Sequence, residues 1–187
     1  MKKVSPNLIG FIIAAIMLVA SVYIYQHFLA KKSEYLLDNN SDESYKIQVG
    51  HTVYTLAAHQ TLPIPLGKGI HHIIVKNEKD SLISQQKIEV KKLRGLVNIG
   101  HQTYFIFGLP YGVKVNVDSI FEHNKTTYQG KKYFGPLKID SSFYIEDFYY
   151  NLNENFPSLT KSSLNDTLRT KIFREGDFKQ FYFEHFE

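Results

Sequence analysis

The N-terminal part of the chain holds an uninterrupted apolar run, and this run limits the possible folds more than any other feature. From Leu8 through Tyr25 the sequence LIGFIIAAIMLVASVYIY has 18 residues and no charged side chain. As an α-helix it would be about 27 Å long, close to the thickness of the hydrocarbon core of a bilayer. We therefore expect a single transmembrane helix over residues 8–30, preceded by a short tail at residues 1–7.

The flanks of the run bear on its orientation and fate. Aromatic residues near its end are followed by Lys31 and Lys32, as at a membrane interface, and Lys2 and Lys3 lie at the other end. The short basic tail favours an amino terminus in the cytoplasm and a C-terminal domain outside it. A cleavable signal peptide has the same basic start and apolar core and is the alternative. Its best cleavage site, Phe28-Leu29-Ala30, has a bulky residue where a small one is preferred.

Charge and cysteine content exclude several classes of protein. The formal net charge is +4, and Lys2, Lys3, Lys31 and Lys32 account for all of it. Residues 33–187 are neutral overall, which argues against nucleic-acid binding, because phosphate contacts need a basic excess. The chain has no Cys, which excludes disulfides, thiolate metal sites and a lipid-modified cysteine. A membrane anchor must therefore be a peptide segment.

The residues after the apolar run predict a stalk and then a set of strands. Residues 31–44, KKSEYLLDNNSDES, are rich in polar and acidic side chains, which is typical of a flexible stalk. Short runs separated by turn residues predict strands over 45–49, 52–57, 61–66, 69–78 and 86–92. The strand after the Gly67-Lys68-Gly69 turn has apolar residues on both faces, which indicates a strand buried inside a β-sandwich.

The segment LGKGIHHIIV, followed by the turn NEKD and the strand KIEV, resembles the PEGA family and related immunoglobulin-like β-sandwiches of bacterial envelope proteins. The resemblance depends on Leu66, Gly69, His71 or His72, and Val75, and the Pro-Glu-Gly-Ala signature is absent. It covers residues 45–94, for which it implies a β-sandwich-like module. It also implies a binding or spacer role rather than an enzymatic one.

Residues 95–187 predict a second β-rich module with some helix, or a continuation of the first as one domain. Aromatic residues are dense there, and they either fill a core or form a surface that binds a partner. Tyr144, Tyr149 and Tyr150 are the candidates for such a surface. Near the C-terminus we expect a strand over 167–174, a turn at 175–177 and a short helix over 178–185. The expected fold class is therefore mainly β, with an α+β C-terminal part.

No stretch of the sequence carries a specific catalytic, metal or cofactor motif, and no cofactor is expected. The eight histidines lack the H-E-x-x-H spacing, and His71 and His72 would point to opposite faces of a strand. We expect a non-catalytic, membrane-anchored envelope protein that presents its β-rich domain to a partner protein or a cell-wall polymer. The alternative is an extracytoplasmic hydrolase in which carboxylates such as Asp118, Asp140 or Asp147 converge in the fold.

Overall fold

The computed structural model describes residues 6–26, 33–111, 116–155 and 167–187. The chain divides into two compact units, residues 1–33 and 34–187. In the first unit, helix α1 (Pro6–Ile24) exposes its large apolar side chains, for example 72% of Phe11. Over the residues that are described, no helix combines the length and the apolar character needed to cross a membrane. The end of the predicted span, residues 27–30, lies outside the described residues.

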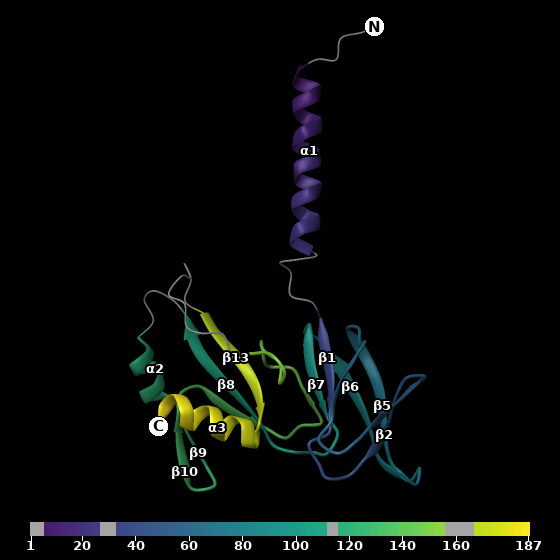
Figure 1. Ribbon diagram of the computed structural model, residues 1–187, viewed down its shortest axis with the longest axis vertical. Coiled ribbons are helices and arrows are strands. Elements are labelled where there is room, and N and C mark those ends of the chain that lie inside the picture. Colours follow the sequence, from purple (N-terminus) through teal and green to yellow (C-terminus); the bar gives the residue numbers. More distant parts are fainter. Residues whose placement is uncertain (1–5, 27–32, 112–115, 156–166) are drawn as a thin grey trace. The chain divides into compact units, whose positions relative to one another are not determined.

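The second unit is mainly β, which confirms the predicted class (Figure 1). Within the described ranges it has thirteen strands and two helices, α2 (Val117–His123) and α3 (Glu175–Phe186). The strands are β1 (Glu34–Asp38), β2 (Tyr45–Val49), β3 (Thr52–Leu56), β4 (Thr61–Ile64), β5 (Gly69–Asn77), β6 (Leu82–Val90), β7 (Arg94–Asn98), β8 (Tyr104–Tyr111), β9 (Lys125–Tyr128), β10 (Lys131–Phe134), β11 (Leu137–Asp140), β12 (Tyr144–Ile145) and β13 (Thr167–Arg174).

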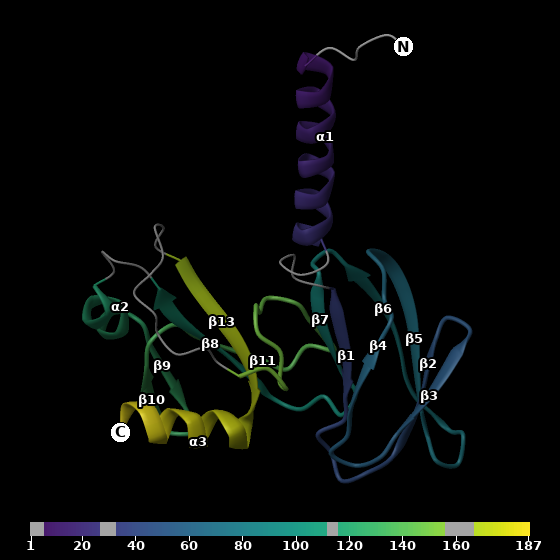
Figure 2. The same cartoon turned by 45° about the horizontal axis from the view of Figure 1, so that its top comes forward.

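Two four-stranded sheets pack face to face. Sheet A has the strand order β12-β7-β1-β4, and sheet B has the order β3-β2-β5-β6. In sheet A, β1 pairs in parallel with β7 and antiparallel with β4. Alternate residues of both sheets, such as Leu37 and Val97 from sheet A and Ile47 and Ile73 from sheet B, are fully buried in one core. Figure 2 shows the resulting sandwich. It includes strands that come before residue 45 and after residue 94 in the sequence.

Two predicted boundaries are wrong. Residues 34–38 are not stalk but β1, an inner strand of sheet A in which Tyr35, Leu36 and Leu37 are all buried. Consecutive residues are buried there because sheet A is covered on both faces, so the strand lacks the alternation of a half-exposed one. The boundary between residues 94 and 95 falls inside β7, because the sandwich needs this strand as the partner of β1. Residues 34–187 are therefore one compact unit, as in the predicted alternative in which the second module continues the first as one domain.

A third sheet covers the face of sheet A that lies opposite to the sandwich core. This sheet C has the order β11-β8-β13. Leu96 and Ile145 from sheet A meet Ile106 and Ile172 from sheet C in a second core. The segment 141–155 runs between the two sheets (Figures 1 and 2). Its residue Phe148 contributes to the same core, so the segment is held in place by apolar contacts.

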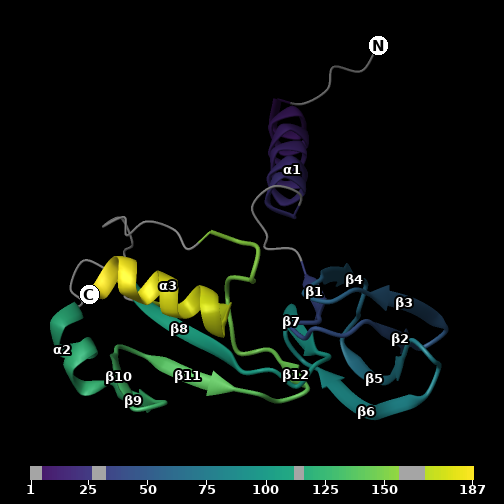
Figure 3. The same cartoon turned by 60° about the horizontal axis from the view of Figure 1, so that its bottom comes forward.

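Helix α3 packs against the other face of sheet C, together with the β9-β10 hairpin (Figure 3). Phe178 stacks on Phe105 of β8 with ring centroids 4.7 Å apart, and the backbone N–H of Phe134 donates to the Tyr182 hydroxyl at 2.7 Å. The strand predicted over 167–174 is confirmed. The predicted turn at 175–177 is wrong, because α3 begins at Glu175, with acidic residues in its first turn where the helix dipole favours them.

A buried carboxylate links the first strand of this unit to the last. Asp38 at the end of β1 has no exposed surface, and it accepts hydrogen bonds from the hydroxyls of Thr61 and Tyr104. It also forms an ion pair with Arg174 at the end of β13, with Nη2 2.5 Å from Oδ1. Burial, and then the charge of Asp38, raises the pKa of Tyr104, so this hydroxyl stays protonated and donates. Asp38 and Arg174 lie near the two ends of this unit in the sequence, so their ion pair connects these ends.

Candidate functional site

The segment that contains Tyr149 and Tyr150 lies along the outer edge of β13. The backbone N–H groups of both tyrosines donate to the carbonyl of Thr170 at 2.9 Å, and the N–H of Ile172 donates to the carbonyl of Tyr150 at 3.1 Å. These bonds form an isolated parallel bridge between Tyr150 and Lys171 at the edge of sheet C. They fix where the two tyrosine rings lie relative to the side chains of β13.

Arg169 and three tyrosines form a cluster at this edge, which we call the tyrosine–arginine cluster (Tyr111, Tyr149, Tyr150 and Arg169). The guanidinium carbon of Arg169 lies 4.0 Å from the centre of the Tyr149 ring. The Tyr149 and Tyr150 rings meet edge to face with centroids 4.8 Å apart. Burial raises the pKa of Tyr111, and the neighbouring Tyr150 hydroxyl adds to this shift. All four side chains are half-buried, as expected of a binding surface held by its own packing.

Next along the same face of β13 is Lys171, a buried ammonium group. It is 7% exposed and donates to the carbonyls of Asn151, Leu152 and Glu154 at 2.8, 3.1 and 2.7 Å. Burial lowers its pKa, while the charge of Glu154 opposes this effect. Because three carbonyls use its three N–H donors, Lys171 closes the 151–154 turn and adds positive charge without a free donor.

A pocket of about 500 Å³ lies between this turn and the C-terminal part of α3. Its apolar wall includes Phe173 and Phe181, and its polar rim includes Glu154 and His185. The carboxylate of Glu154 is already bound by the guanidinium of Arg94 and the backbone N–H of Asn151. The pocket is lined by Leu152, Asn153, Glu154, Asn155, Lys171, Phe173, Phe181 and His185. We call it the β13 pocket.

The structure brings together two of the three tyrosines that the sequence suggests. Tyr144 lies elsewhere, in β12, and packs against the sandwich core between sheets A and B. Its hydroxyl is buried, and this burial raises its pKa. Alternation along the chain explains the separation, because Tyr144 faces one core while its neighbour Ile145 faces the other. Tyr144 is therefore a half-buried residue beside the sandwich core, not part of the cluster.

Sequence reasoning missed Arg169 and Lys171. Arg169, Lys171 and Phe173 are every second residue along the chain. This pattern indicates them, because alternate residues of a strand share one face. In the register of sheet C these three residues lie opposite Leu109, Phe107 and Phe105. A charged side chain on an apolar face of a strand is unfavourable unless other contacts compensate for its burial. For Lys171 these contacts are the three carbonyls, and for Arg169 the contact is the Tyr149 ring.

Two of the three carboxylates suggested for a hydrolase, Asp140 and Asp147, occupy ion pairs. Asp147 binds Lys92 at 2.5 Å and Lys138 at 3.3 Å, and Asp140 binds Lys138 at 2.9 Å. The hydrogen bond from Lys92 lowers the pKa of Asp147. Burial alone would raise the pKa of Asp140, but bonds from Ser142 and Lys138 outweigh it and lower this pKa as well. A general acid needs a raised pKa, so this pair does not suit that role. Asp118 lies apart, in the first turn of α2.

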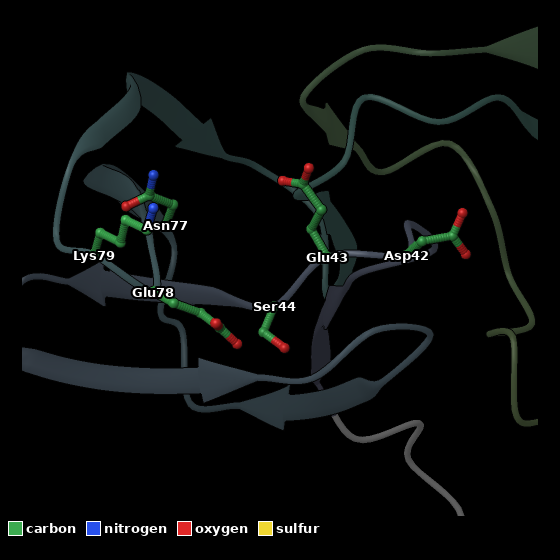
Figure 4. Close-up of a pocket in the computed structure, with 6 residues that line it drawn as sticks. All are labelled: Asp42, Glu43, Ser44, Asn77, Glu78 and Lys79. Atoms are coloured by element: carbon green, nitrogen blue, oxygen red, sulfur yellow. The ribbon is translucent and has the colours of Figure 1, made fainter.

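An acidic pocket of about 390 Å³ lies where the chain enters β2 and where β5 turns into β6 (Figure 4). Its lining includes Asp42, Glu43 and Glu78, and the side chains of Glu43 and Glu78 point in different directions in Figure 4. The Nε2 atom of His59 lies 2.9 Å from Oδ1 of Asp42, within hydrogen-bond distance. Among the described residues, no group of three His, Asp or Glu side chains could hold a metal ion.

Comparison with known protein families, with curated proteins and with solved structures finds no match to this chain.

Proposed function

We propose that this protein is a single-pass, membrane-anchored and non-catalytic envelope protein that binds a partner through the tyrosine–arginine cluster and the adjoining β13 pocket. In this proposal residues 8–30 hold the protein in a bilayer, and residues 34–187 face a partner protein or a cell-wall component outside the cytoplasm. The resemblance of residues 45–94 to PEGA-like modules agrees with a binding role.

The observation that supports the binding role most strongly is the state of Arg169. The guanidinium lies over the Tyr149 ring, and no carboxylate in the described part of the chain pairs with it. Tyrosine and arginine are the residues that most often dominate binding at protein interfaces. A half-buried arginine beside three tyrosines and a pocket is therefore a site at which a partner would gain much of its binding energy.

The anchor is supported by the uncharged run from Leu8 to Tyr25 and its lysine flanks. Large apolar side chains of α1, including Phe11, Ile16 and Met17, are exposed to more than half of their area. Such a surface is unfavourable in water, because the free energy of the system falls when an apolar group leaves water. A bilayer would cover this helix on all sides.

Membrane attachment is tested by washing membranes from cells that make the full-length protein with alkaline carbonate. We expect the protein to stay in the pellet. Ile13→Arg should release much of it, because an arginine at the centre of a span costs about 2.5–3.5 kcal/mol. Ile13→Leu is the matched control and should behave like the original chain. If Ile13→Arg stayed in the pellet to the same extent, the proposed anchor would be wrong.

The binding role is tested by chemical crosslinking in native membranes. We expect a crosslinked species that contains the full-length protein and that weakens in Arg169→Gln and in Tyr149→Ala. Lys87→Gln changes a cation on β6 in sheet B, away from the cluster, and should leave this species unchanged. Equal crosslinking in all four proteins would mean that the cluster does not bind the partner.

A further inference from the structure

The three arginines of the chain differ in one respect that points to a ligand. Arg94 is bound by Glu154 and Glu34, and Arg174 is bound by Asp38. Arg169 is half-buried, and among the described residues no carboxylate lies within ion-pair distance of it. Partly burying a guanidinium without a counter-charge is unfavourable, so its place in the fold requires a compensating contact. The Tyr149 ring supplies only part of it.

The contact with Tyr149 suits Arg169 to an anion. The guanidinium carbon lies 4.0 Å from the centre of the Tyr149 ring, and a guanidinium presents its N–H donors as a planar fork. Such a fork can donate two parallel hydrogen bonds to a carboxylate or a phosphate. Because the ring restricts the arginine side chain, binding would cost less side-chain entropy than it would with a flexible lysine.

The neighbours of Arg169 narrow the chemistry of that anion. Lys171 has used its donors on three carbonyls, and Glu154 is neutralised by Arg94. Asp177, whose charge also acts on Lys171, is exposed on α3, and His185 lies at the rim of the pocket. Among the described residues around this site, the guanidinium of Arg169 is thus the main donor for a negative charge. Arg169 shares a face of β13 with Lys171 and Phe173, and these two line the β13 pocket.

We infer that this site takes a single carboxylate attached to an apolar group, as carried by an acidic and apolar segment of a partner polypeptide. The carboxylate would bind Arg169, and the apolar group would enter the β13 pocket against Phe173 and Phe181. A phosphate polymer fits less well, because its higher charge calls for several cationic donors and the described residues of this site offer one. The inference rests on the proposed function and specifies the chemistry of the partner.

The test is a calorimetric titration of the full-length protein in detergent micelles with N-acetylphenylalanine, which carries a carboxylate and an apolar ring. The neutral amide of the same compound and inorganic phosphate are titrated in parallel. We expect the acid to bind at least about tenfold more tightly than the amide, as for loss of a charged hydrogen-bonding group. Because this comparison uses the unaltered protein, it does not depend on whether a variant folds.

Variants then locate the site. Arg169→Gln should weaken binding of the acid by about tenfold and remove its preference over the amide. Lys87→Gln should change neither quantity. Equal binding of acid and amide, tighter binding of phosphate than of the acid, or unchanged binding in Arg169→Gln would each overturn the inference. If crosslinking in native membranes still depended on Arg169 while the acid failed to bind, the carboxylate would be wrong and the proposed binding role would stand.

Discussion

At the scale of single residues, the Asp38 carboxylate shows how one buried charge is accommodated. It has no exposed surface, and its two oxygens receive donors from Thr61, Tyr104 and Arg174. The guanidinium of Arg174 also binds the Thr61 hydroxyl at 2.8 Å, so the partners hold one another in place. Such a network stabilises a fold only when all its members are present, because each deletion leaves another group unsatisfied.

Asp38→Asn should therefore lower the free energy of unfolding by about 3–5 kcal/mol, since it leaves Arg174 without its counter-charge inside the fold. Urea denaturation followed by circular dichroism measures this loss. Asp80→Asn removes a carboxylate from the exposed pair with Lys46 and should leave the midpoint unchanged. If the two variants lost similar stability, the Asp38 network would not be an important contributor.

The raised pKa of Tyr104 predicts how the free energy of unfolding changes at alkaline pH. Its folded-state pKa is raised above the ordinary value of 10.0, first by burial and then by Asp38. Above about pH 10 the unfolded chain therefore releases this proton while the folded chain keeps it, so stability falls as the pH rises. Tyr104→Phe should cost about 1–3 kcal/mol at neutral pH through the lost hydrogen bond, and its further decline at alkaline pH should be shallower. Tyr54→Phe, away from Asp38, should keep the steeper decline in melts recorded from about pH 8 to 11.

At the scale of elements, local patterns predicted the strands of sheet B well and the remaining elements less well. The strands β2, β3 and β5 end or begin near Gly50 or at Gly69, and these glycines are local signals. β1 lacks such a signal, because its burial comes from β4 and β7 far along the chain. The site shows the same limit: aromatic density indicated Tyr149 and Tyr150, but only the pairing of segment 149–150 with β13 reveals Arg169 beside them.

The turn before β5 allows a matched test at this scale. Gly69 has φ +126°, a conformation that side chains with a Cβ rarely adopt, whereas Gly67 has no positive φ. At both glycines the position that a Cβ would occupy has no other atom within 4 Å, so space does not distinguish them. Gly69→Val should cost about 1 kcal/mol or more, and Gly67→Val should cost clearly less. Equal thermal shifts in the two variants would show that backbone strain is not the cause.

At the scale of the whole molecule, the second unit depends on contacts between its two ends. β1 pairs with β7 over its full length and with β4 from Tyr35 to Asp38, and Asp38 binds Arg174, which is 136 residues away in sequence. These contacts could not be predicted from the sequence, because residues 34–38 carry no local pattern that indicates their distant partners. The polar residues on both sides of this short strand instead suggested a stalk.

The difference between a stalk and a central strand has a direct experimental consequence. A chain that begins at Glu34 keeps every strand of the second unit and should melt cooperatively, at the same temperature as that unit in the full-length protein. A chain that begins at Tyr45 lacks β1, which leaves β4 and β7 without their shared partner and removes the counter-charge of Arg174. We expect it to be unfolded or aggregated, since the loss of an inner strand exceeds the few kcal/mol that keep a domain folded. Circular dichroism and size-exclusion chromatography of the two chains test this expectation. A cooperative melt from the shorter chain would show that residues 34–44 are a stalk that the fold does not need.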